Sequence, residues 1–164
     1  HYSRDRAAEK CWRYDQPDSS ESRTAMNEYR FKDIRLKMKA SFTATITEEM
    51  MDSFRKISND DNPLHTDNEY ARSRSFSGKV AYGLLTSAFY STLAGVYLPG
   101  KYCLLQGIDI VFKRPAFAGD ALTVSGEVSY INEAYKLIEI KGCIENQRGQ
   151  IVSKSKIKAG VIDE

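Results

Sequence analysis

The alternation of apolar and polar residues divides the first half of the domain into a strand and two helices. Residues 40–46 alternate and are rich in β-branched side chains, which predicts a strand. Thr47 suits a helix N-cap, and apolar residues then recur at helical spacing as far as Ile57. We expect this helix to end near Ser58, where turn-forming residues begin, and a shorter helix over residues 68–73.

A longer apolar segment covers residues 79–95. It has no charged residue after Lys79, and its polar residues are all small or aromatic. A helix with so little polar surface is typical of one that is buried on nearly all sides. We expect it to end near Gly95, with residues 98–100 closing the exit.

Everything after Lys101 has the pattern of strands. Four segments, 108–113, 124–129, 137–144 and 151–159, are separated by glycine, asparagine and aspartate turns. A meander of four long antiparallel strands would therefore follow one buried helix. A curved sheet wrapped around that helix accommodates both, so the fold class predicted is α+β.

The first 27 residues differ from the rest, because they are polar and charged and cannot form a core. We divide the chain into an N-terminal arm, 1–27, and a single domain, 28–164. The arm is expected to be mobile, or to dock through Trp12 and Tyr14, and we do not expect function to lie there.

Charge and cysteine content limit the classes of partner and the cellular compartment that we expect. The 24 Lys and Arg against 22 Asp and Glu leave a net charge of +2, which gives no support for a nucleic-acid groove. No apolar run approaches the roughly 18 residues of a membrane span. The three cysteines are odd in number and far apart, which argues against disulfides and favours a reducing cytosol. A cytoplasmic protein is expected, with three unpaired cysteines: Cys11, Cys103 and Cys143.

One polar segment carries candidate chemistry. His65 lies five residues after Asp60, across a turn stiffened by Pro63. Histidine exchanges protons near neutral pH, and a carboxylate on the same loop can hold a water molecule and accept its proton. Two such groups facing one water would form a minimal hydration device. Taken alone, the segment fits an acidic turn with a structural histidine better than it fits a catalytic pair.

The same segment does not match a metal site. It has several aspartates, but it lacks the spacing, the glycine and the terminal glutamate of an EF-hand loop. A zinc site would need a second histidine or a nearby cysteine. No metal is expected.

The run Asp60-x-Asn62-Pro63-Leu64-His65-x-Asp67 closely resembles the signature of MaoC-like, (R)-specific enoyl-thioester hydratases. Further landmarks follow in the family's order, so that the resemblance spans about residues 40–160. They are Ala81-Tyr82-Gly83-Leu84-Leu85, Leu98-Pro99-Gly100, Phe112-Lys113-Arg114-Pro115 and Gly119-Asp120. The resemblance implies a hotdog fold, in which an antiparallel sheet wraps around a long central helix.

It also implies a reaction: syn addition of water across a trans-2-enoyl thioester, giving an (R)-3-hydroxyacyl product. Asp60 and His65 would be the catalytic pair, with Asp60 as base and His65 as acid, or the two as one coupled unit. The backbone N–H of Gly83 would stabilise the enolate oxygen, since N–H groups in the first turn of a helix are free. Close helix–sheet packing is the alternative reason for this glycine.

Five further residues are candidates for substrate binding. Asn62 either braces the loop or contacts the thioester, and Ser91 either lies near the catalytic pair or bonds to its own helix. Tyr82 stands where the family commonly has histidine, so substrate shape or local hydrogen bonding would differ there. Lys113 and Arg114 would meet phosphates, or form a solvated strand end.

The resemblance implies a homodimer acting on a thioester of coenzyme A or of acyl-carrier phosphopantetheine, with no separate cofactor. Two other functions stay open: thioester hydrolysis by a related hotdog enzyme, and a catalytically silent domain that binds acyl thioesters or serves assembly. The sequence leaves the acyl chain length undetermined.

Overall fold

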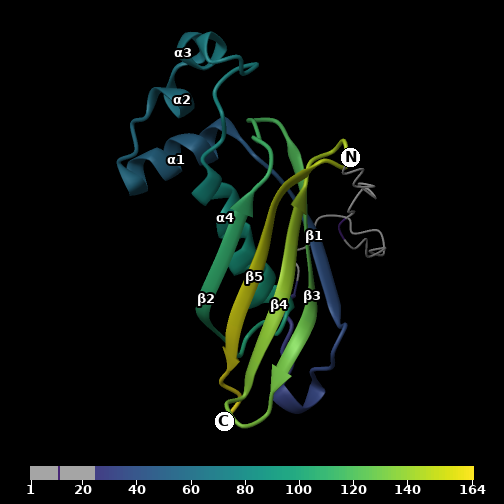
Figure 1. Cartoon of the computed structure of the whole chain (residues 1–164). Coiled ribbons are helices and arrows are strands. Elements are labelled where there is room, and N and C mark those ends of the chain that lie inside the picture. Colours follow the sequence, from purple (N-terminus) through teal and green to yellow (C-terminus); the bar gives the residue numbers. More distant parts are fainter. Residues whose placement is uncertain (1–10, 12–24) are drawn as a thin grey trace, which may run out of the picture.

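Five antiparallel strands form one sheet, in the order β1-β3-β4-β5-β2 (Figure 1). The computed structural model describes residue 11 and residues 25–164, so the expectations for Trp12 and Tyr14 lie outside the described residues. The strands are β1 (Lys39–Thr45), β2 (Cys103–Phe112), β3 (Ala121–Asn132), β4 (Leu137–Glu145) and β5 (Ile151–Val161).

The helices are α1 (Glu48–Ser58), α2 (Pro63–Thr66), α3 (Asn68–Ser73) and α4 (Gly83–Thr92). A short 3₁₀ helix, Phe31–Asp33, precedes β1, and a π-helical turn, Leu93–Tyr97, continues α4. The expected bounds of α1 and α3 are confirmed, whereas α2 had no separate pattern. Among the described residues, no helix has the length and apolar character that crossing a membrane requires.

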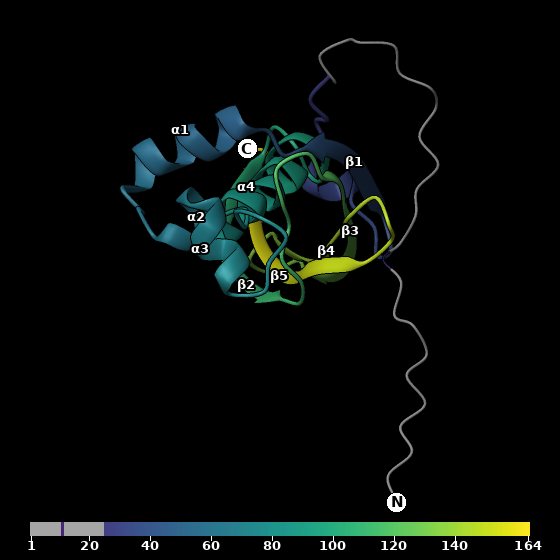
Figure 2. The same ribbon diagram turned by 90° about the horizontal axis from the view of Figure 1, so that it is seen from above.

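The sheet curves around α4, as the view from above shows (Figure 2). Tyr90 and Leu93 of α4 and its π-helical turn are fully buried against Val124, Ile140 and Ile157 of the strands. The predicted α+β fold, a sheet wrapped around a central helix, is therefore confirmed. Helices α1 to α3 lie outside the sheet, near the N-terminal end of α4 (Figure 1), and Met51 of α1 packs into the core.

The expected meander of four strands is wrong in one respect. Strands β3, β4 and β5 are consecutive neighbours, but β2 pairs with β5 at the opposite edge from β1. Strand β3 pairs instead with β1, placing Phe42 opposite Val124. An alternating pattern indicates which face of a strand is buried, but it does not indicate which strand lies beside it.

The expectation that the central helix is buried on nearly all sides is also wrong. It begins at Gly83, and Leu84 is 67% exposed, followed along the same face by the exposed Ala88 and Ser91. Several apolar side chains of β2 are exposed as well: Leu104, Leu105, Ile108, Val111 and Phe112. The sequence pattern of an apolar helix face is the same whether the protein's own core or a partner covers that face.

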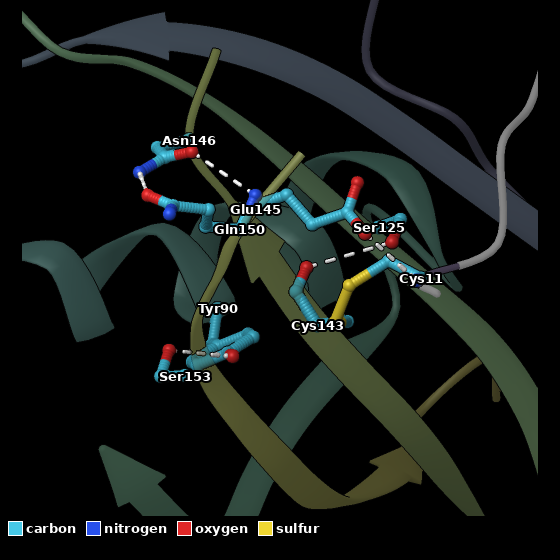
Figure 3. Close-up of a disulfide and its surroundings, with 8 residues drawn as sticks. All are labelled: Cys11, Tyr90, Ser125, Cys143, Glu145, Asn146, Gln150 and Ser153. Carbon is cyan, nitrogen blue, oxygen red and sulfur yellow. Dashed lines mark hydrogen bonds between the residues drawn. A yellow bond between two sulfur atoms is a disulfide. The ribbon is translucent and has the colours of Figure 1, made fainter. Parts of the chain in front are cut away.

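Two of the cysteines are paired, which corrects the expectation of three unpaired thiols. Cys11 and Cys143 form a disulfide with a Cα–Cα distance of 5.8 Å (Figure 3). The Cys11 N–H also donates to Oε1 of the buried Glu145 at 2.8 Å. The two cysteines are 132 positions apart, and the sequence does not show the pairing because only the fold brings them together. Cysteine usage therefore gives no support for a reducing compartment.

The end of the N-terminal arm is attached to the far end of the central helix. The backbone N–H of Asn27 donates to Val96 O at 2.9 Å, and its side chain donates to Tyr97 O at 2.7 Å. Gly100 has φ +87°, and a Cβ there would collide with the Asn27 carbonyl. Glycine at this turn thus permits the contact.

Candidate active site

The segment that carries Asp60 is shaped by local capping. Thr47 Oγ1 accepts from Met50 N at 3.1 Å at the start of α1, and Asn59, the C-cap residue after Ser58, has a φ of +54° that reverses the chain. The Asp60 carboxylate then accepts from Asn62 N at 3.1 Å. Asn62 Oδ1 in turn accepts from Leu64 N at 2.9 Å, which caps α2.

His65 is held in a defined orientation. Its Nδ1 lies 2.7 Å from the carbonyl oxygen of Val80, and Val80 N donates to Leu64 O at 3.0 Å. A carbonyl has no proton to give, so Nδ1 carries the hydrogen and donates it. Nε2 is therefore the nitrogen that exchanges a proton. Because Nδ1–H is present in both charge states of the ring, this exchange leaves the bond to Val80 intact.

A cleft of about 320 Å³ lies beside His65. It is lined by His65, Phe76, Val80, Ala81, Gly83, Thr86, Phe112, Lys113, Arg114, Pro115, Ala116 and Val152. The fold thus places four predicted site residues, His65, Gly83, Lys113 and Arg114, around one largely apolar space. Such a cleft with a few polar groups is the usual form of a small-molecule site.

Gly83 is the first residue of α4, where a backbone N–H has no acceptor within the helix. A Cβ at Gly83 would lie 2.9 Å from two ring carbons of Phe112. Close packing against Phe112, one of the two expected reasons for a glycine here, is therefore present. Gly83 also lines the cleft, where its N–H could act on a substrate.

Tyr82 lies outside the residues that line the cleft, although we expected it to contact substrate. Its side chain is 2% exposed, and its hydroxyl donates to the backbone oxygen of Asp60 at 2.7 Å. Its ring lies against that of His65, with 4.1 Å between the ring centroids. Burial raises the pKa of the Tyr82 phenol, and the negative charge of Asp60 adds to the effect.

The remaining predicted residues lie elsewhere. Asp60 is exposed and is joined to the surroundings of His65 through Tyr82. Asn62 braces the loop, which is one of the two roles expected of it. Ser91 lies on the exposed face of α4 with Leu84, away from the residues that line the cleft.

Sequence reasoning missed Val80, Phe112 and Arg55. Val80 acts through its backbone carbonyl, for which a sequence has no signal, and Phe112 meets Gly83 only after folding. Arg55 forms an ion pair with Asp61, and this hydrogen bond and charge raise the pKa of Arg55. The negative charge of Asp61, the residue after Asp60, is thereby paired. In the part of the chain that the structure describes, no three His, Cys, Asp or Glu side chains are grouped as metal ligands.

Comparison with known sequences matches residues 27–146 to the family described as MaoC like domain. An (R)-specific enoyl-CoA hydratase from Rhodospirillum rubrum is 31% identical over 111 residues, which cover 68% of this chain and 77% of the relative. Another from Aeromonas caviae is 33% identical over 99 residues, covering 60% of this chain and 74% of the relative.

The fold agrees with these sequence matches. The structure of an R-hydratase from Pseudomonas aeruginosa in its unliganded form superimposes with a TM-score of 0.79 at 28% identity, covering 85% of this chain and 89% of that one. The family match spans most of the chain, and the arrangement of sheet and central helix is shared. The chain belongs to the MaoC-like domain family and is a hydratase or dehydratase with a hotdog fold.

Proposed function

We propose that the protein catalyses the (R)-specific hydration of a 2-enoyl thioester and the reverse dehydration of a 3-hydroxyacyl thioester. The observation that carries this proposal is His65: its Nδ1 is held by Val80 O, and it shares a cleft with the first backbone N–H of α4. This combination supplies a proton-exchanging nitrogen and an oxyanion donor at one apolar space.

In the hydration direction, water attacks C3 of the enoyl group while the Asp60 carboxylate takes one of its protons. Electron density moves from the double bond to the thioester oxygen, where the Gly83 N–H stabilises the enolate. Collapse of the enolate forms the C2–H bond with a proton from Nε2 of His65. Asp60 then loses its proton and His65 regains one through solvent, which restores the starting state.

The thioester carrier is coenzyme A or the phosphopantetheine of an acyl carrier protein. Lys113 and Arg114 line the cleft directly after β2 and bring two positive charges to it. Phosphates of either carrier would pair with them. Because the relatives are named enoyl-CoA hydratases, coenzyme A esters are the first substrates to test.

The active form is proposed to be a homodimer. Leu84 and Ala88 of α4 and the apolar side chains of β2, an edge strand, leave an uncovered apolar surface on one chain. Large exposed apolar patches mark interaction sites in soluble proteins. Sedimentation equilibrium would show a dimer mass, and Leu84→Asp would shift it towards the monomer.

The test of function uses crotonyl-CoA and longer enoyl-CoA esters, with loss of enoyl absorbance as the measurement. Asp60→Asn and His65→Ala should each lower kcat by about 10²–10⁴ without unfolding the protein. Glu133→Gln, which changes an exposed carboxylate in the turn between β3 and β4, is the control and should leave kcat unchanged. Chiral analysis of the product should give the (R)-3-hydroxyacyl ester.

Three outcomes would contradict the proposal. Full activity in both Asp60→Asn and His65→Ala would contradict the proposed mechanism. Release of free thiol from acyl-CoA would instead indicate a thioesterase. Binding of enoyl-CoA with no turnover, in the folded dimer, would indicate a silent acyl-binding domain.

A further inference from the structure

Tyr82 joins segments that are distant in the sequence. It is the residue before Gly83, and its buried phenol reaches back to the backbone oxygen of Asp60. The Tyr82 ring packs against the His65 ring. It also packs against Phe54 of α1, with 5.0 Å between the two ring centroids. A single side chain therefore contacts both members of the proposed acid–base pair.

The loop between α1 and α2 has few other attachments. Asp60 N donates to Ser58 Oγ at 3.2 Å, and Asp61 pairs with Arg55, so these bonds only tie the loop to α1. Asn62 bonds within the loop and to α2. Over the described residues, the Tyr82 hydroxyl provides the only hydrogen bond from residues 59–62 to any residue beyond position 66.

We propose that Tyr82 is a positioning residue, which fixes the backbone at Asp60 and the ring of His65 relative to the N–H of Gly83. The hydrogen bond sets the position of the loop, and the ring contact limits rotation of the imidazole, whose Nδ1 is already held by Val80. Together these restraints set the direction of Nε2. The kinetic part of this inference rests on the proposed function, whereas the positioning is a property of the free protein.

The phenol suits this role because it keeps its proton. Its pKa lies above the ordinary value, so the hydroxyl continues to donate to Asp60 O throughout the neutral range. Small displacements of a catalytic group are costly, since an error of about 1 Å can lower a rate by about 10²-fold.

Tyr82→Phe removes only the hydroxyl and retains the ring. The matched control is Tyr90→Phe in α4, where a buried hydroxyl bonds to Ser153 Oγ at 2.9 Å, away from the loop. We expect Tyr82→Phe to lower kcat for crotonyl-CoA about tenfold with little change in KM. Tyr90→Phe should leave kcat and KM near the wild-type values, although both variants lose a similar amount of thermal stability.

Amide hydrogen exchange in the free protein supplies a readout that does not depend on catalysis. The amides of Asn62 and Leu64 should exchange about tenfold faster in Tyr82→Phe, because the loop that protects them opens more often. In Tyr90→Phe they should exchange as in the wild type.

The outcomes separate the two proposals. If the wild type hydrates no enoyl thioester, the proposed function fails, and the exchange rates alone decide the positioning role. If Tyr82→Phe matches Tyr90→Phe in exchange, positioning is overturned, whatever happens to kcat. Faster exchange with unchanged kcat in an active enzyme overturns the role of Tyr82 in the reaction.

Discussion

Two regions of the molecule differ in how they are held. The sheet and α4 enclose side chains with almost no exposure, such as Tyr90, Leu93 and Ile140. Residues 48–78, which include α1, α2 and α3, are mostly exposed, and their hydrogen bonds are largely local caps and turns. The chain's candidate acid–base pair lies in this second region, and not in the core.

This contrast indicates that stability and catalysis depend on different sets of residues. A rigid scaffold commonly carries its functional groups on less regular segments, which tolerate exposed polar side chains. Two of the contacts that join these regions lie at the acid–base pair: the Val80 carbonyl accepts from His65, and the Tyr82 hydroxyl donates to the Asp60 carbonyl. Met51 of α1 also packs into the core. Changes in the core should therefore alter the free energy of unfolding, and changes at the two contacts of the acid–base pair should alter kcat.

The largest expected effect on stability is in the core. Leu93→Ala should lower the free energy of unfolding by about 2–5 kcal/mol, because Leu93 is fully buried beneath the sheet. Urea denaturation followed by circular dichroism would measure it. Ile57→Ala on α1, where the side chain is 80% exposed, is the control and should change it by less than about 0.5 kcal/mol. Equal decreases in unfolding free energy for the two variants would contradict the proposed difference between the regions.

The disulfide should give the next largest effect. Cys11→Ser removes the crosslink to β4 and should lower the free energy of unfolding by about 2–4 kcal/mol. Reductant should lower the Tm of the wild type and leave that of Cys11→Ser unchanged. If reductant has no effect on the wild type, the crosslink does not contribute to stability.

A smaller effect is expected at the start of α1. Thr47→Ala removes the side-chain acceptor for Met50 N and should cost about 1 kcal/mol of unfolding free energy. Ser53→Ala, an exposed position within the same helix, should cost almost nothing. We expect kcat to stay near the wild-type value in both, since Asp60 follows the other end of the helix. A large fall in kcat for Thr47→Ala would show that α1 transmits disorder to the loop.

The elements that sequence predicted well are those with local signals. The cap at Thr47 and the turn residues after Ser58 set the bounds of α1, and both act within a few residues. The strand segments were recognised by alternation alone. What failed depends on distant partners: the place of β2 beside β5, the exposed face of α4 and the Cys11–Cys143 bond. None of these features can be recognised within a short stretch of sequence.

The candidate site divides in the same way. The signature around Asp60 and His65 and the glycine that opens α4 were visible as residue types at fixed spacings. The orientation of His65 comes from a backbone carbonyl 15 residues away, which any residue at position 80 could supply. Tyr82 was noticed as a departure from the family pattern, but its contact with the Asp60 backbone required the folded chain.

The bond between Cys11 and Cys143, which are 132 positions apart, makes a covalent ring out of most of the polypeptide. A protease that cuts once inside this ring adds a molecule of water and releases no fragment. Non-reducing electrophoresis would then show a single species after such a cut, and reduction would separate the pieces. Mapping of exposed segments by limited proteolysis must therefore compare both conditions, since an intact band under oxidising conditions does not mean an intact backbone.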